Sequence, residues 1–139
     1  MENKTFLDFL PTNFRHEKSF FIQNNLTDFE KLSNLTYLDI SDIQRKSSLC
    51  TLNNLKKIRA IAIFKNEIGI SPPHAYILLH CGISSLKSLS LATPIELKPK
   101  IGRLERILRV KTETDTTFTT LKEWIKKASQ IDKSIGNLG

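Results

Sequence analysis

The spacing of apolar residues along the chain predicts a succession of amphipathic helices. Near the C-terminus, Phe118, Leu121, Trp124, Ile125 and Ala128 recur every three or four positions, and charged residues fill most of the positions between them. This spacing places the apolar side chains on one face of a helix and the charged side chains on the other. We expect Trp124 in the core; the alternative is that its ring stacks on a nucleobase.

The same periodicity, together with helix start and stop signals, predicts helices along the rest of the chain. The expected ranges are 3–10, 13–24, 27–33, 37–43, 51–66, 71–80, 84–91, 94–97, 101–110 and 117–131. Pro11 is expected to end the first helix, and Pro99 to separate two of the later ones, because proline removes a hydrogen bond and clashes inside a helix.

Few residues interrupt these helical stretches, since the 139 residues include only 5 Gly and 5 Pro. A β-sandwich or barrel needs a turn signal roughly every 8 to 12 residues, which this chain lacks. The content of 40% hydrophobic and 25% charged residues is that of an ordinary globular domain. The predicted fold class is therefore all-α.

The chain contains two degenerate copies of one helical unit. When the sequence is shifted by 57 positions, Asn25 falls on Gly82, and the stretch 36–39 falls on 93–96. Asn and Gly tolerate the left-handed conformation that ends many helices. The two aligned stretches both begin with Thr and carry an acid three residues later, which indicates a helix start.

The last helices of the two copies correspond at a shift of 66, which pairs Thr51 with Thr117. The second copy therefore holds nine extra residues, between Leu97 and Thr117. We expect tandem units at residues 1–66 and 67–131, packed as one compact helical domain, and a flexible tail at residues 132–139.

The start of the second copy resembles a known motif. The stretch Ile68-Gly69-Ile70-Ser71-Pro72-Pro73-His74-Ala75, followed by YILLHCGI and SSLKSL, resembles a helix-hairpin-helix unit, whose pattern is apolar-Gly-apolar-Gly, three variable residues and Ala. Together with the closing TLKEWIKKA, residues 67–130 are similar to an uncharacterised family of helix-hairpin-helix domains related to those of DNA polymerases and repair proteins. The resemblance implies two tandem degenerate helix-hairpin-helix units and binding to the DNA backbone.

In helix-hairpin-helix units, a glycine lets the turn approach a phosphodiester, and the N–H groups of the next helix start point at phosphate oxygens. The resemblance therefore makes Gly69 and Ser71 candidate nucleic-acid contacts. Ser71 occupies the second glycine position, and Pro72 and Pro73 remove two N–H donors. The equal alternative is a plain turn at Gly69 and an ordinary capped helix start.

The strongest charge feature is the segment 98–111, whose net charge is +5. Its candidate phosphate-binding residues are Lys98, Lys100, Arg103, Arg106, Arg109 and Lys111. On a helix that turns about 100° per residue, the three arginines fall within an arc of about 120°. Leu104, Ile107 and Leu108 fall on the opposite side, so this helix is expected to bury one face and present guanidinium groups, which suit phosphates, on the other. The alternative is a solvated helix face, and a smaller basic cluster lies at 56–59.

Composition narrows the classes of function further. The net charge of +7 favours an anionic partner. Neither the two cysteines, Cys50 and Cys81, nor the histidines have metal-ligand spacing, and no phosphate-binding loop is present. We therefore expect no catalysis, no metal and no cofactor. No segment approaches the ~18–20 apolar residues of a membrane span, and no secretory signal is evident, so we expect a cytoplasmic protein with no membrane partner and reduced thiols.

These observations predict a non-enzymatic, sequence-tolerant nucleic-acid-binding protein, with DNA favoured over RNA by the family resemblance. The alternative is a protein-interaction or scaffold module with no nucleic-acid role. The sequence leaves the oligomeric state open.

Overall fold

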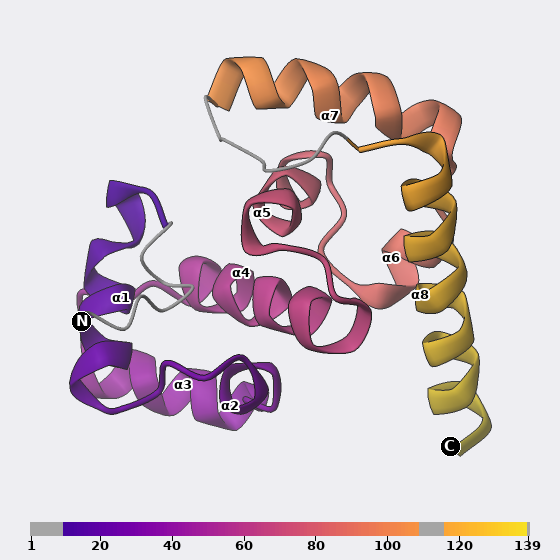
Figure 1. Ribbon diagram of the computed structural model, residues 1–139. Coiled ribbons are helices and arrows are strands. Elements are labelled where there is room, and N and C mark those ends of the chain that lie inside the picture. Colours follow the sequence, from indigo (N-terminus) through magenta and orange to yellow (C-terminus); the bar gives the residue numbers. More distant parts are fainter. Residues whose placement is uncertain (1–9, 109–115, 139) are drawn as a thin grey trace, which may run out of the picture. The chain divides into compact units, whose positions relative to one another are not determined.

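The computed structural model describes residues 10–108 and 116–138, and every regular element within these ranges is a helix (Figure 1). The prediction of an all-α fold is confirmed. None of the described helices combines the length and the apolar character that crossing a bilayer requires. The chain divides into two units, residues 1–67 and 68–139.

The first unit is built around one central helix. Its elements are the 3-10 turn η2 (Thr12–Phe14), α1 (Arg15–Gln23), α2 (Phe29–Ser33), α3 (Tyr37–Lys46) and α4 (Leu52–Ile63), which runs into the π-helical turn η3 (Phe64–Ile68). Both α2 and α3 pack against α4. The large side chains that are fully buried in this unit include Phe14, Phe21, Leu32, Ile40, Leu55 and Ile58.

The second unit repeats this plan. Its elements are α5 (Pro72–His80), α6 (Leu86–Ser90), α7 (Pro94–Leu108) and α8 (Phe118–Leu138). The short α6 lies against the long α8, α7 also packs on α8, and α5 packs on α7 (Figure 1). The buried apolar residues here include Ile77, Leu78, Leu89, Leu97, Ile101, Leu121 and Ala128.

The two units share their helix order, the lengths of their first two helices, and the packing of the second and third helices on the fourth. The first helices, α1 and α5, have nine residues each, and the second helices, α2 and α6, have five each. In each unit the second and third helices pack on the fourth. The third helix differs, with 10 residues in α3 and 15 in α7, and the rest of the extra length lies in the connection that follows α7.

The first helix of each unit ends at a residue with a left-handed backbone, as the repeat predicts. Asn25 has φ 57° and Gly82 has φ 87°. In both units the N–H of the next residue donates to the carbonyl five positions earlier, at 2.8 Å in the first unit and 3.0 Å in the second. This Schellman arrangement is what the aligned Asn and Gly were expected to form.

Threonine hydroxyls cap the later helices at equivalent positions. Thr36 accepts the N–H of Asp39 at 3.1 Å, and the Asp39 carboxylate accepts the N–H of Thr36 at 2.9 Å, which completes a capping box. Thr93 accepts the N–H three residues on at 3.3 Å. Thr51 and Thr117 do the same at 3.2 Å and 3.1 Å. The predicted helix starts at these four threonines are confirmed.

Pro99 does not divide α7, contrary to expectation. One continuous helix runs from Pro94 to Leu108 and contains it. Leu97 and Ile101, on either side of Pro99, are buried. The burial of each apolar side chain contributes roughly 1.5–3 kcal/mol, which offsets the cost of about 3 kcal/mol for a proline inside a helix.

Two other predictions concern the two ends of the chain. The last helix continues to Leu138, beyond the predicted end at residue 131. Ile135 keeps the helical apolar spacing beyond Ala128 and Ile131, so the sequence pattern itself does not stop there. The predicted helix at 3–10 falls almost entirely outside the described residues.

Candidate nucleic-acid interface

The exposed side of α7 carries three cations, and we call this surface the α7 basic face. Lys100, Arg103 and Arg106 are all exposed, whereas Leu97 and Ile101 on the opposite side of the helix are buried. At about 100° per residue the three cations span an arc of about 120°. The ion pair found among the described residues joins Arg45 and Asp42 in the first unit, so no described carboxylate forms an ion pair with these three cations, although the exposed Glu96 lies four positions before Lys100 on the same side of α7.

Lys98 belongs to the packing of the second unit and not to the α7 basic face. Its Nζ donates to the carbonyl oxygen of Thr116 at 3.1 Å and lies 5.5 Å from the centre of the Phe118 ring. The side chain is half-buried. These contacts tie α7 to the start of α8. The two remaining candidates of the segment, Arg109 and Lys111, lie outside the described residues.

The apolar side of α7 agrees with prediction only in part. Leu104 and Leu108 are half-buried, but Ile107 is 65% exposed, so its predicted burial is wrong. Residues four apart on a helix are neighbours on one face, which places Ile107 next to Arg103. At about 100° per residue Ile107 falls between Lys100 and Arg103 in angle, so the α7 basic face includes an exposed aliphatic side chain.

Gly69 lies in the turn before α5 and has φ 86°. That conformation is disfavoured for residues with a side chain. No atom lies within 4 Å of the position that a Cβ would occupy. The backbone conformation, and not a lack of space, therefore favours glycine at this position.

Ser71 is the N-cap of α5. Its hydroxyl accepts the N–H of His74 at 3.4 Å and lies 2.8 Å from the His74 Nδ1. Pro72 and Pro73 have no N–H, and the N–H of Ala75 donates to the Ser71 carbonyl at 2.9 Å. The first turn of α5 thus uses its own donors internally, which is the arrangement of an ordinary capped helix start.

The α7 basic face and the two candidate residues before α5 are associated with different ends of that helix. Burial raises the pKa of the Cys81 thiol above its usual value, and Lys100 and Arg103 lie near enough to oppose this rise. Cys81 is the C-cap of α5, whereas Ser71 caps the start, about 13 Å away for nine helical residues. Neither Gly69 nor Ser71 is hydrogen-bonded to a cation of the α7 basic face in the described part of the chain.

The smaller basic cluster on α4 is engaged within the first unit. The Arg59 guanidinium donates to the carbonyl of Leu35 at 3.2 Å. It also lies 4.8 Å from the centre of the Tyr37 ring, which Lys56 Nζ approaches at 5.5 Å. These cations cover an aromatic ring, so they form part of the packing between α3 and α4.

The apolar stripe of α8 faces the interior over most of its length. Leu121 and Ala128 are buried. Trp124 is half-buried, and its ring meets the His74 ring edge-on with 5.6 Å between centres. Phe118 was expected in the same stripe, but it is 46% exposed because it begins the helix and lies beside Lys98 instead of in the core.

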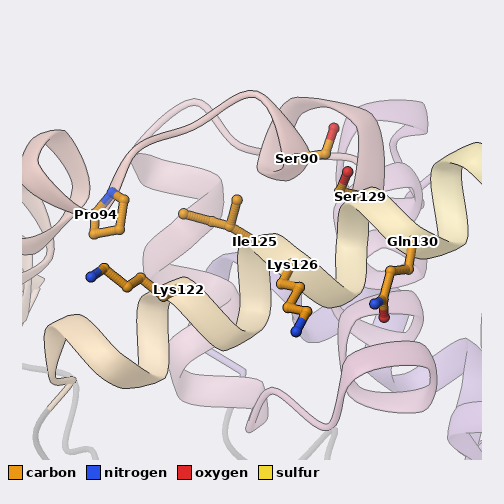
Figure 2. Close-up of a pocket in the computed structure, with 7 residues that line it drawn as sticks. All are labelled: Ser90, Pro94, Lys122, Ile125, Lys126, Ser129 and Gln130. Atoms are coloured by element: carbon orange, nitrogen blue, oxygen red, sulfur yellow. The ribbon is translucent and has the colours of Figure 1, made fainter.

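Sequence reasoning missed a groove of about 470 Å³ along α8 (Figure 2). It lies between α6, the first residue of α7, and α8. Its apolar lining comes from Pro94 and Ile125, and lysine side chains line one side. No motif marks these residues, and only a comparison of the two copies, position by position, would have drawn attention to them.

Residues 11–131 match a family model described as Domain of unknown function (DUF4332). The match includes most of the described residues of both units. No curated protein and no solved structure shows significant similarity to the chain.

Proposed function

The chain belongs to the DUF4332 family, and we propose that it binds nucleic acid without catalysing a reaction, through contacts between the α7 basic face and the phosphate backbone. In this proposal the two units are degenerate helix-hairpin-helix units that bind DNA in preference to RNA, as the resemblance of residues 67–130 implies.

The exposure of Lys100, Arg103 and Arg106 on one side of α7 is the observation that carries the proposal. No described carboxylate forms an ion pair with them, so their charge remains available to an outside anion. Planar guanidinium groups bind phosphate oxygens through two parallel hydrogen bonds. Arg103 and Arg106 lie about 4.5 Å apart along the helix axis, which allows both to engage one strand.

The distribution of charge between the units also supports the proposal. Residues 68–139 contain eleven Lys and Arg against six Asp and Glu, a net charge of +5. Residues 1–67 contain ten against eight, a net charge of +2. The unit that carries the α7 basic face therefore has the stronger attraction for a polyanion, which speeds association.

Contacts of this kind read no bases. Phosphates are the same in every sequence, so binding through them is tolerant of sequence and sensitive to salt. The N–H groups of His74 and Ala75 are satisfied within the first turn of α5, so in this proposal the backbone of Gly69 and Ser71 itself positions the nucleic-acid strand.

Fluorescence anisotropy with a labelled DNA duplex tests the proposal. The triple variant Lys100→Gln, Arg103→Gln, Arg106→Gln should bind at least about tenfold more weakly at low salt, because three phosphate contacts are lost. The matched control Lys31→Gln, Lys46→Gln, Lys87→Gln removes the same charge from exposed positions elsewhere.

The control should stay within about twofold of the unmodified protein, since phosphate contacts act at short range under screening salt. If both variants bound DNA equally weakly, the loss would come from net charge alone, and the assignment of the α7 basic face would be refuted. Absence of binding to duplex DNA at low salt would refute the function. The same titration with an RNA duplex tests the preference for DNA.

A further inference from the structure

The groove along α8 forms a second surface, separate in composition from the α7 basic face. Its lining includes Ser90, Pro94, Lys122, Ile125, Lys126 and Ser129. In Figure 2 Pro94 and Lys122 lie toward one end, Ser90 and Ser129 toward the other, and Ile125 lies between them. A volume of about 470 Å³ is within the range of roughly 300–1,000 Å³ that is typical of ligand sites.

The first unit carries larger side chains at the equivalent positions, where the Tyr37 ring lies at the surface with 64% of it exposed. The shifts that align the copies pair Pro94 with Tyr37 and Ile125 with Arg59. In the first unit, the Arg59 guanidinium lies 4.8 Å from the centre of the Tyr37 ring, and Lys56 approaches the same ring at 5.5 Å. The second unit has the smaller Pro94 and the uncharged Ile125 there, and the space stays open.

One cation of the first unit's arrangement is retained in the second. Lys122 aligns with Lys56, and Lys126 adds a second amine one turn further along α8. Both lysines are exposed and line the groove. The groove thus has an apolar lining and two ammonium groups beside it. In the first unit the equivalent lysine, Lys56, lies over the Tyr37 ring.

From this correspondence we infer that the groove binds an aromatic side chain of a protein partner, with carboxylates beside it. The ring occupies the place that Tyr37 has in the first unit and lies against Pro94 and Ile125. Lys122 approaches it as Lys56 approaches Tyr37, in a cation–π contact. Carboxylates next to the aromatic residue pair with Lys122 and Lys126, which complement their charge.

Two exposed aliphatic residues favour a protein over a nucleobase as the occupant. Leu91 is 75% exposed and Ile95 is 78% exposed. They directly follow Ser90 and Pro94, which line the groove. Exposed apolar residues beside a groove are typical of protein interaction sites, because a partner covers them and removes them from water. A nucleobase in the groove presents one flat ring and no aliphatic side chains, so it leaves Leu91 and Ile95 exposed to water.

The test uses a capped pentapeptide with a central tryptophan and two glutamates on each side. Titration of the full-length protein, followed by two-dimensional ¹⁵N–¹H NMR up to about 5 mM peptide, detects even a millimolar interaction. We expect the amide signals of Ser90, Ile125 and Ser129 to shift. The same peptide with alanine in place of tryptophan should bind at least about tenfold more weakly, because the aromatic contact is lost.

The double variant Pro94→Tyr, Ile125→Arg places the first unit's tyrosine and arginine at the equivalent positions of the groove. It should lose binding to the tryptophan peptide, whereas Ile22→Arg, the same change at an exposed position of the first unit, should keep it. If the double variant does not fold, Lys122→Glu, Lys126→Glu replaces it, because both residues are exposed. This variant should also lose binding to the acidic peptide.

Three results would overturn the inference. The first is equal binding of the tryptophan and alanine peptides, which would leave the aromatic ring without a role. The second is unchanged binding by a folded double variant. The third is a response of these amides to a single-stranded thymidine oligonucleotide and not to the peptide, which would identify a nucleobase as the occupant.

Discussion

Glu17 is a buried carboxylate that connects α1 to the start of α4, and its removal gives the sharpest stability prediction. The residue is 1% exposed. Its Oε2 accepts the N–H of Thr51 at 2.8 Å, and its Oε1 accepts from the Asn54 side-chain amide at 3.2 Å. In α3 the carboxylate of Asp39, in the first turn, accepts the N–H of the N-cap. In α4 that first-turn position is Asn54, and Glu17 supplies the acceptor from another helix.

The expected loss in Glu17→Ala follows from these contacts. A hydrogen bond to a charged group contributes about 1.5–3 kcal/mol, and a negative charge at a helix N-terminus adds about 0.3–1 kcal/mol. Because Asn54 is partly exposed and regains water, we expect the free energy of unfolding to fall by about 3 kcal/mol in total. Glu17→Gln keeps the shape and one acceptor oxygen, so about 1–2 kcal/mol should be lost.

Urea denaturation followed by circular dichroism measures both changes. Glu30→Ala is the matched control, because Glu30 is an exposed acid in the first turn of α2. It should cost less than about 1 kcal/mol. A loss in Glu17→Ala no larger than in Glu30→Ala would show that the buried carboxylate does not hold the start of α4.

Three further predictions concern the thiols and the helix ends. In the double variant Lys100→Gln, Arg103→Gln, the pKa of Cys81 should rise further, so its reaction with a thiol reagent near pH 8 should slow at least about twofold; an unchanged rate would place these cations away from the thiol. Burial raises the pKa of Cys50 above its usual 9.0, so the unfolded chain ionises first. The free energy of unfolding should therefore fall as pH rises above about 9, and less steeply in Cys50→Ala; an identical slope would contradict this. Gly82→Asn should be tolerated better than Gly82→Val by about 1 kcal/mol in urea denaturation, because Asn adopts left-handed conformations more readily; equal costs would argue against the Schellman end.

Features that depend on a few neighbouring residues could be predicted from the sequence. The helix starts at Thr36, Thr51 and Thr93, and the left-handed ends at Asn25 and Gly82, are local arrangements whose hydrogen bonds join residues within one turn. The repeat is inferred because these cap residues recur at fixed shifts along the sequence. The order of the described helices in the two units agrees with that repeat.

Features that depend on contacts between helices could not be predicted from periodicity. Pro99 lies inside α7 because buried residues on both sides hold the helix together. Ile107 is exposed because no described part of the unit covers that side of α7. Lys98 is drawn to Thr116, 18 positions away along the chain, and a count of charges along the segment does not reveal this.

The candidate sites also include one feature that the sequence predicted and one that it did not. Helical geometry alone predicted that Arg103 and Arg106 share a face, and their exposure agrees with it. The groove along α8 is lined by residues of three different helices, so no single segment of the sequence indicates it. The sequence indicates it only when the two copies are aligned, which pairs Tyr37 and Arg59 with Pro94 and Ile125.

The salt dependence of DNA binding by the unmodified protein and by the variant Lys100→Gln, Arg103→Gln, Arg106→Gln tests the central claim most directly. Each phosphate contact releases about 0.9 counterions from duplex DNA, so the slope of log affinity against log salt should be shallower in the variant by about 2.7. This part of the slope corresponds to a roughly 40-fold loss of affinity between about 50 and about 200 mM salt. A variant that binds DNA with the slope of the unmodified protein would contradict the account.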